Sequence, residues 1–363
     1  MGQKAWFFLF LFLIFLFFWR FLNLPKANFS PGQRIKIEAT LRQEPKITGN
    51  LQKFSLAGIE ITTFRFPEFH YGERLEVEGV VEKKNFLEFP EIRKIGEEKT
   101  ILGLVYRLRR KIEGIYRQSL PEPYSSLLSG IVLGIKSEMP SSFYNSLQKT
   151  GTLHVVVASG MNVSILAGTL VSFLILFLRR QIAVFLSFIL IWFYVFLAGA
   201  EIPILRAGIM GSLAFLAQGL GREEDAWRAF GLSALFLLFL NPLSIFDLGF
   251  QLSFGATFGI LFFGSFFSRL FSRLPNQIRS DFSQTLAAQI TTLPIILLNF
   301  GYYSPFSPLV NVLIAWVLPW IMRLGMVIAS FGLIFFFLGR IFAFLTFPFL
   351  AYFVFIIKLF SGL

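Results

Sequence analysis

The sequence predicts a polytopic α-helical membrane protein with a small soluble β domain near its N-terminus. Of its 363 residues 55% are hydrophobic, and the mean hydropathy is +0.68, values that a soluble domain with a solvated surface does not sustain. The apolar runs are about twenty residues long, which suits helices crossing a hydrocarbon core of roughly 30 Å. The weaker ten-residue alternation typical of an outer-membrane barrel is absent. A polar stretch after the first apolar run alternates with a period of two and predicts the β domain.

Residues 1–23 are predicted to form a first transmembrane helix. Lys4 precedes a run of Phe and Leu, and no small-residue cleavage site follows it, unlike in a secretory signal peptide. Residues 24–99 then contain "RIKIEATL", "FSLAGIEITTF" and "RLEVEGVVE", separated by Pro, Gly and Asn. These are signals for short strands joined by turns. We expect a five-stranded, OB-like β domain, soluble beside the membrane.

Residues 100–120 are predicted to form a basic amphipathic helix in the membrane interface. Apolar residues from Ile101 to Ile115 recur at helical spacing, and basic residues occupy the other positions: Arg107, Arg109, Arg110, Lys111 and Arg117. Such a helix binds anionic lipid. Contact with nucleic acid is the alternative. The formal net charge of +12 is likewise compatible with topology signals or with a polyanionic partner.

Residues 121–363 are expected to form the transmembrane bundle. With the N-terminal helix, the apolar runs make about ten spans, the later ones at 155–178, 182–198, 203–220, 227–240, 245–267, 284–300, 307–322, 324–338 and 341–360. The run at 126–135 is too short to cross, so we expect a re-entrant or interfacial hairpin buried against protein.

Prolines and small residues interrupt the regular pattern of this bundle. Each proline at an apolar run is expected to break or begin a helix, as at Pro203, Pro242, Pro294, Pro308 and Pro319. Broken helices at membrane depth are tolerated where the freed backbone groups face protein or a water-filled cavity. Small residues at four-residue spacing are expected to pack helices closely: Gly130 with Gly134, Gly249 with Ser253, and Gly255 with Gly259.

Ionisable residues inside the apolar runs are candidate site residues. A charge near the bilayer centre costs roughly 3 kcal/mol, so such residues usually face a bundle interior or a cavity. Arg206 needs a partner or water, and Asp247 is either that partner or a helix cap. The run "REED" before Ala226 is expected to cap the following helix. His154 is either a hydrogen-bonded core histidine or a site residue.

The residues exclude several kinds of chemistry. The chain has two histidines and no cysteine, and no spacing typical of a zinc site occurs. Ser159 lacks the G-x-S-x-G elbow of a nucleophile. We therefore expect no cofactor, no metal and no enzymatic reaction. In the β domain, "TTFRFPEFHYGERL" interleaves aromatic and basic side chains, which indicates either a base-stacking surface or rings that fill the core or touch lipid.

Six blocks in order resemble the competence-domain family of ComEC-type DNA uptake proteins: "LLSGIVLGIKSEMP", "FYNSLQKTGTLHVVVASGMNVSILAG", "PILRAGIM", "EEDAWRAFGLSALFLLFLNP", "IFDLGFQLSFGATFGI" and "SPFSPLVNVLIAWVLP". The second and fifth are the most specific. The family usually has a second histidine where this chain has Asn162, which puts a role for two imidazoles in doubt. Many relatives also carry a C-terminal metallo-β-lactamase-like domain. This chain ends at Leu363 without one, so we expect a short form or a nuclease on a separate chain.

The resemblance implies an inner-membrane channel through which one strand of DNA is taken up in natural transformation. A polytopic transporter or membrane enzyme for a smaller anionic substrate is the alternative. The expected location is the bacterial cytoplasmic membrane, with the β domain on the outer side. Expected partners are single-stranded DNA, membrane lipid, a separate nuclease, a DNA receptor and a cytoplasmic motor; a homo-oligomer stays open.

A kinked, polar segment would line a water-filled path for the strand. The expected pathway residues are Thr150, Gly151, His154, Ser159, Gly160, Asn162, Arg206, Asp247 and Gln251. The expected surface for single-stranded DNA comprises Arg65, Phe66, Phe69, Tyr71, Arg107, Arg109, Arg110 and Lys111.

Overall fold

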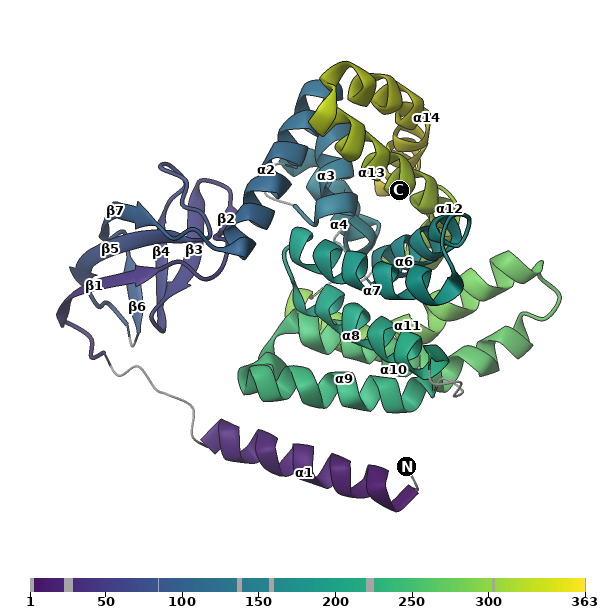
Figure 1. The fold of residues 1–363 in the computed structure, drawn as a ribbon, viewed down its shortest axis with the longest axis horizontal. Coiled ribbons are helices and arrows are strands. Elements are labelled where there is room, and N and C mark those ends of the chain that lie inside the picture. The colour runs from purple at the N-terminus through teal and green to yellow at the C-terminus, as the bar shows by residue number, and fades with distance from the viewer. Residues whose placement is uncertain are drawn as a thin grey trace. The chain divides into compact units, whose positions relative to one another are not determined.

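The structure is a computed structural model, and it describes residues 3–22, 29–83, 85–135, 139–156, 160–219, 225–301 and 304–362. The chain divides into two compact units. The β unit is Asn23–Lys111, and the helical unit is Met1–Leu22 together with Ile112–Leu363. Figure 1 labels their elements. Helix α2, Ile101–Ser119, contains the division between the two.

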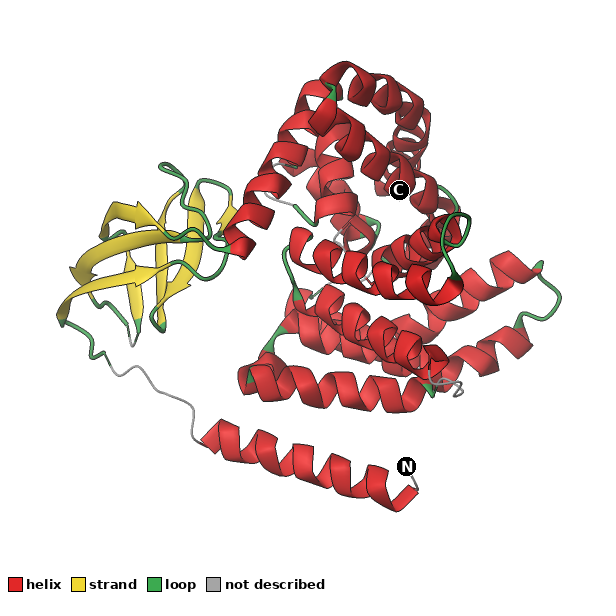
Figure 2. Ribbon diagram, viewed as in Figure 1, coloured by secondary structure: helices red, strands yellow, loops and turns green. Residues whose placement is uncertain are grey.

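The β unit contains two sheets (Figure 2). One has the order β1-β5-β7 and is antiparallel; the other has the order β2-β3-β4-β6, in which β4 and β6 run parallel. The strands are β1 (Arg34–Thr40), β2 (Lys46–Thr48), β3 (Leu51–Leu56), β4 (Ile59–Phe64), β5 (Glu73–Val80), β6 (Phe86–Glu88) and β7 (Glu91–Glu97). Seven strands are described where five were expected, because β2 and β6 are too short for a period of two to be recognised. The OB-type barrel stays a prediction.

Alternation along the strands builds the core of the β unit. On β3, Gln52, Phe54 and Leu56 are buried while the residues between them are more exposed. Successive side chains of a strand point to opposite faces, so one face of each sheet becomes apolar. The core comprises Ile35, Leu41, Phe54, Leu56, Ile59, Ile61, Phe69, Leu75, Val77, Val81 and Leu87.

The helical unit accounts for most of the chain. Its helices are α1 (Gln3–Leu22), α3 (Tyr124–Leu133), α4 (Ser141–Lys149), α5 (Leu153–Val156), α6 (Gly160–Leu174), α7 (Arg180–Leu197), α8 (Ile202–Gly219), α9 (Ala226–Leu240), the 3₁₀ helix η1 (Pro242–Phe246), α10 (Leu248–Leu270), α11 (Asn276–Phe300), α12 (Ser307–Ala315), α13 (Leu318–Ile334) and α14 (Phe336–Ser361). Asp225 caps α9 through the Arg228 amide, as expected. Helix α3 is short and almost wholly buried, which agrees with the expected buried hairpin.

Three of the described helices, α7, α10 and α14, are long and apolar enough to cross a membrane. The pair α12 and α13, bent by 51° at a break, would count as a fourth span. Shorter apolar helices are α3, α6, α9 and the Ile202–Leu213 part of α8. Many apolar runs expected to be separate spans therefore form helices shorter than the bilayer needs. The run expected at 155–178 is divided between α5 and α6, and residues 157–159 lie outside the described residues.

Prolines and glycines have different effects in this unit. Pro242, Pro308 and Pro319 lie in the first turns of η1, α12 and α13, where a missing N–H costs nothing. The expectation that Pro294 interrupts a helix was wrong, because α11 continues through it. The expected close packing is present at Gly259, where a Cβ would collide with the Ala287 carbonyl of α11.

Candidate functional site

Arg206 lies in the second turn of α8 and is held by neutral groups. Its Nε donates to Ser253 Oγ at 2.8 Å, and a terminal nitrogen donates to Thr257 Oγ1. The guanidinium also lies 5.8 Å from the centroid of the Phe254 ring and within 3.8 Å of Met210 Sδ. We call these five residues the Arg206 site. It is assembled by α8 and α10, which present one cation and two hydroxyls from facing helices.

No carboxylate pairs with Arg206 among the described residues. A partly buried charge without a counter-ion is costly, so it needs water or an anionic ligand. The first residue of α6 lies beside the same group, since a Cβ on Gly160 would come within 3.0 Å of an Arg206 nitrogen. The expected pathway residues Gly160 and Arg206 are therefore brought together.

Asp247 is not the partner of Arg206. Its carboxylate accepts a hydrogen bond from the Phe250 amide at 3.1 Å and caps α10, with its side chain otherwise exposed. Gln251 donates to the Ile245 carbonyl at 3.0 Å. Of the two roles left open for Asp247, the helix cap is the one that the structure contains.

Thr150 and Gly151, between α4 and α5, belong to a packed polar cluster with Ser307 of α12. Thr150 is 1% exposed and bonds Thr152 Oγ1 and carbonyls of α4. Gly151, at φ +67°, faces Ser307 so closely that a Cβ would lie 2.9 Å from the Ser307 side chain. Ser307 Oγ is 3.4 Å from the Gly151 carbonyl and accepts from Gln289 Nε2 at 3.0 Å.

Gln289, Ser307 and the neighbouring Asn311 were missed in the sequence, because neutral polar side chains were considered only in the segment from Thr150 to Asn162 and at Gln251. Asn311 Nδ2 lies 3.4 Å from Ser307 Oγ, and Asn311 is 8% exposed. A neutral polar side chain in a long apolar helix is the signal that would have found them. We call Thr150, Gly151, Gln289, Ser307 and Asn311 the Ser307 cluster.

The remaining residues of the polar segment do not form one line. His154 is exposed on the single turn α5. Asn162 is 1% exposed and donates from Nδ2 to the Ile131 carbonyl at 2.8 Å, which joins α6 to α3. Ser159 lies outside the described residues.

In the β unit, the expected aromatic surface is only partly at the surface. Phe69 is 6% exposed and meets Phe54 edge-on, and Tyr71 is 7% exposed and stacks on Tyr106 at 4.9 Å. Phe69 fills the core, which was the alternative for it, and Tyr71 is buried against α2. Phe66 is 73% exposed, with the Arg65 guanidinium 5.4 Å from its ring centroid.

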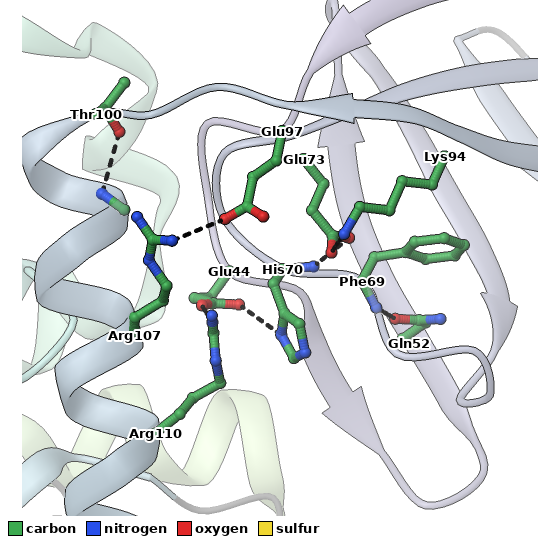
Figure 3. Close-up of polar contacts among 11 residues, drawn as sticks. Glu44, Gln52, Phe69, His70, Glu73, Lys94, Glu97, Thr100, Arg107 and Arg110 are labelled. Atoms are coloured by element: carbon green, nitrogen blue, oxygen red, sulfur yellow. Dashed lines mark hydrogen bonds and ion pairs between the residues drawn. The ribbon is translucent and has the colours of Figure 1, made fainter.

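Two arginines of the basic helix pair with carboxylates of the same unit (Figure 3). Arg110 lies 3.1 Å from Glu44, and Arg107 lies 3.8 Å from Glu97. His70 Nδ1 is 3.8 Å from the second oxygen of Glu44. Arg109 lies over the Tyr106 ring, and Lys111 is exposed. Arg107 and Arg110 therefore attach α2 to the end of β7 and to the connection between β1 and β2, and they are less available to a polyanion than the sequence suggested.

Within the described parts of the chain, no group of three or more His, Asp and Glu side chains is placed to hold a metal ion. No solved structure matches the chain.

The sequence comparisons found one curated relative and one family, and the family match covers the Arg206 site and the Ser307 cluster. ComE operon protein 3 of Bacillus subtilis (strain 168) is 29% identical over 219 residues, which is 58% of this chain and 26% of that protein. The aligned region therefore covers about a quarter of its relative. The competence protein family matches residues 131–363. Because this match covers more than half of the sequence, the chain belongs to the competence protein family.

Proposed function

We propose that this protein is a channel in the bacterial inner membrane that takes up single-stranded DNA in natural transformation. The observation that carries the proposal is the Arg206 site, a guanidinium in an apolar helix held by Ser253 and Thr257, with no carboxylate beside it in the part of the chain that the structure describes. Family membership supports the role in competence, and the three or four apolar helices of spanning length support the location.

The chemistry of the Arg206 site suits a passing phosphate. A guanidinium binds phosphate oxygens through directed N–H donors. Both hydroxyls are on α10, so they orient the guanidinium while leaving its charge uncompensated. A pathway with many such cations would retain the strand, because each phosphate contact adds to the affinity. One cation among neutral donors allows contact and release.

The Ser307 cluster supports a closed pathway in this conformation. Thr150, Ser307 and Asn311 are buried. Ser307 bonds Gly151, Gln289 and Asn311, which joins the end of α4 to α11 and α12. Helices α12 and α13 meet at a 51° bend. If the pathway opens by movement of α12 at this bend, the first turn of α12 separates from Gly151. Polar groups at such a break are then available to a strand or to water.

The distribution of arginine supports an orientation. Helices α6 to α9 and the α10–α11 hairpin run back and forth, so alternate connections between them fall at one end (Figure 1). The basic residues at or next to these connections are Arg179, Arg180, Arg228, Arg269, Arg273 and Arg279. Short basic turns face the cytoplasm. Arg20 of α1 donates to the Leu240 carbonyl at 3.1 Å, at the opposite end of α9. The β domain, which follows α1, is therefore proposed to lie outside.

The test is entry of a labelled single-stranded oligonucleotide into liposomes that contain the purified protein. Arg206→Gln removes the charge and keeps a polar side chain, so entry should fall while insertion into liposomes is unchanged. The matched control is Arg323→Gln, because Arg323 also donates to a threonine hydroxyl, Thr169 Oγ1 at 3.1 Å, but is exposed. Equal entry for both variants would contradict the proposal. Entry of small anions but not of oligonucleotides would favour a transporter. The nuclease, receptor and motor are proposed to be separate proteins.

A further inference from the structure

Three phenylalanines near the ends of β4 and β6 are exposed on the β unit. Phe64 ends β4 and is 60% exposed, Phe66 follows it at 73%, and Phe89 directly follows β6 at 44%. The rings of Phe64 and Phe89 are 4.5 Å apart. We call these residues the Phe patch. A small domain rarely exposes neighbouring large apolar side chains without a binding role.

A buried glutamine holds the loop that displays two of these rings. Gln52 is 0% exposed, and its Nε2 donates to the carbonyls of Phe64 and Pro67 at 2.8 and 2.7 Å. Its Oε1 accepts from the Phe69 amide at 3.3 Å, a contact visible in Figure 3. Residues 64 to 69 are thus fixed to the core of the unit from beneath. The outward position of Phe66 is built into the fold rather than left to a loose loop.

Phe89 is held in a conformation that side chains rarely adopt. Its φ is +48°, in the left-handed region, and such residues persist only where the surroundings impose them. Its amide donates to the Thr62 carbonyl at 2.8 Å, which ties it to β4. Strain at an exposed ring beside a second exposed ring indicates selection for the surface they make together.

The charges beside the Phe patch disfavour a polyanion. Arg65 lies over the Phe66 ring, and its Nε is 2.9 Å from Glu68 Oε1. The exposed residue next to Phe89 is Glu88. The charged residues named beside the patch are therefore one arginine and two carboxylates. Single-stranded DNA is normally bound where aromatic rings alternate with uncompensated cations.

The chain keeps this domain near the proposed membrane. Six residues separate Leu22, the end of α1, from Phe29, whose amide donates to Asn85 Oδ1 at 3.0 Å. An extended chain advances at most about 3.6 Å per residue, so this tether reaches about 25 Å. Asn85 directly precedes β6, the strand that ends at the Phe patch.

We propose that the Phe patch inserts into the outer surface of the lipid bilayer and anchors the β domain there. Phenylalanine rings without polar atoms, on a rigid loop with little net charge, suit the boundary of headgroups and acyl chains. The occupant is zwitterionic or neutral lipid, bound by apolar contact rather than by charge. The proposal rests on the membrane location proposed above but not on DNA transport.

The test uses the absence of cysteine from the full chain. Phe66→Cys and the control Lys36→Cys, on an exposed position of β1, are labelled with an environment-sensitive fluorophore in phosphatidylcholine vesicles. The Phe66→Cys label should be quenched by nitroxide-bearing lipid and protected from aqueous iodide, at low and at high salt. The Lys36→Cys label should show the reverse. When Phe64→Ser and Phe89→Ser are combined with Phe66→Cys, the label at position 66 should become accessible to aqueous iodide.

Two outcomes would overturn the proposal. If iodide reaches both labels equally, the patch is not in lipid. If the Phe66→Cys label is protected only after single-stranded DNA is added, the patch binds nucleic acid. Oligonucleotide entry, measured on the unlabelled protein with Arg206 intact or replaced, tests the proposed transport separately. An anchored patch without entry would reject transport alone.

Discussion

Arg206 and Asp247 are opposite charges within apolar runs of the sequence, yet their surroundings differ. Asp247 caps α10 from an exposed position, whereas Arg206 contacts only neutral groups among the described residues. A cap needs an acceptor and not a charge, because Asn caps a helix nearly as well as Asp. Capping of α10 therefore requires the side-chain oxygen of Asp247 but not its negative charge.

We predict that Asp247→Asn leaves both the amount of protein and oligonucleotide entry unchanged. Asp247→Ala, which loses the acceptor for the Phe250 amide, should destabilise the protein by about 1 kcal/mol and lower its thermal midpoint in detergent. A loss of entry in Asp247→Asn at normal stability would instead place this carboxylate in the pathway.

The basic amphipathic pattern of helix α2 is compatible with more than one role. Its basic face suggested a contact with lipid or DNA, but Arg107 and Arg110 pair with Glu97 and Glu44. These pairs are partly exposed, so each contributes little to stability. Their consequence is electrostatic, since a compensated cation attracts phosphate weakly.

We predict that Arg107→Gln combined with Arg110→Gln changes little in the binding of single-stranded DNA to the full chain. Binding is measured by fluorescence anisotropy of a labelled oligonucleotide at several salt concentrations. If both arginines contacted phosphate, the slope of log affinity against log salt concentration would become less steep by about 2. A decrease of that size would restore the DNA-binding role of α2.

The helices α10 and α11 approach each other closely at Gly259. A Cβ at Gly259 would collide with the Ala287 carbonyl and with Thr291 Oγ1, so backbone would have to move. At Gly264, on the same helix, the nearest atom is 4.0 Å away. The two glycines therefore form a matched pair.

We predict that Gly259→Ala destabilises the helical unit by about 1–3 kcal/mol through overpacking and reduces the amount of folded protein. Gly264→Ala should stabilise it by about 0.5–1 kcal/mol, because alanine restricts the unfolded chain and favours helix. Thermal unfolding in detergent, followed by size-exclusion chromatography, measures both. Equal effects of the two variants would mean that α10 and α11 do not pack as described.

For the molecule as a whole, we predict opposite accessibility for the β domain and for the turn between α10 and α11. Ser272→Cys lies in the α10–α11 turn among the arginines, and Ser55→Cys lies on β3; both positions are exposed. A membrane-impermeant maleimide should label Ser55→Cys in intact spheroplasts and Ser272→Cys only after the membrane is opened. The reverse pattern would invert the topology.

The sequence by itself determined the features that depend on near neighbours. The alternation on β3, the limits of α2 and the Asp225 cap of α9 follow from residues within a few positions of one another, where backbone geometry fixes which side chains share a face. Family membership also followed from ordered local blocks. The apolar runs indicated helices but not their lengths, because a break such as that between α12 and α13 depends on what packs beside it.

Only the tertiary structure decided which polar groups meet. Ser307 bonds Gly151 across 156 positions, Arg206 reaches Ser253 across 47, and Arg110 reaches Glu44 across 66. No local pattern specifies such pairs, since they depend on which helix or strand packs against which. For that reason Arg110 pairs with a carboxylate, whereas Arg206 has only neutral partners within the described segments. Burial likewise separated Phe66 from Phe69, because Gln52 turns the loop so that one ring faces outward and the other enters the core.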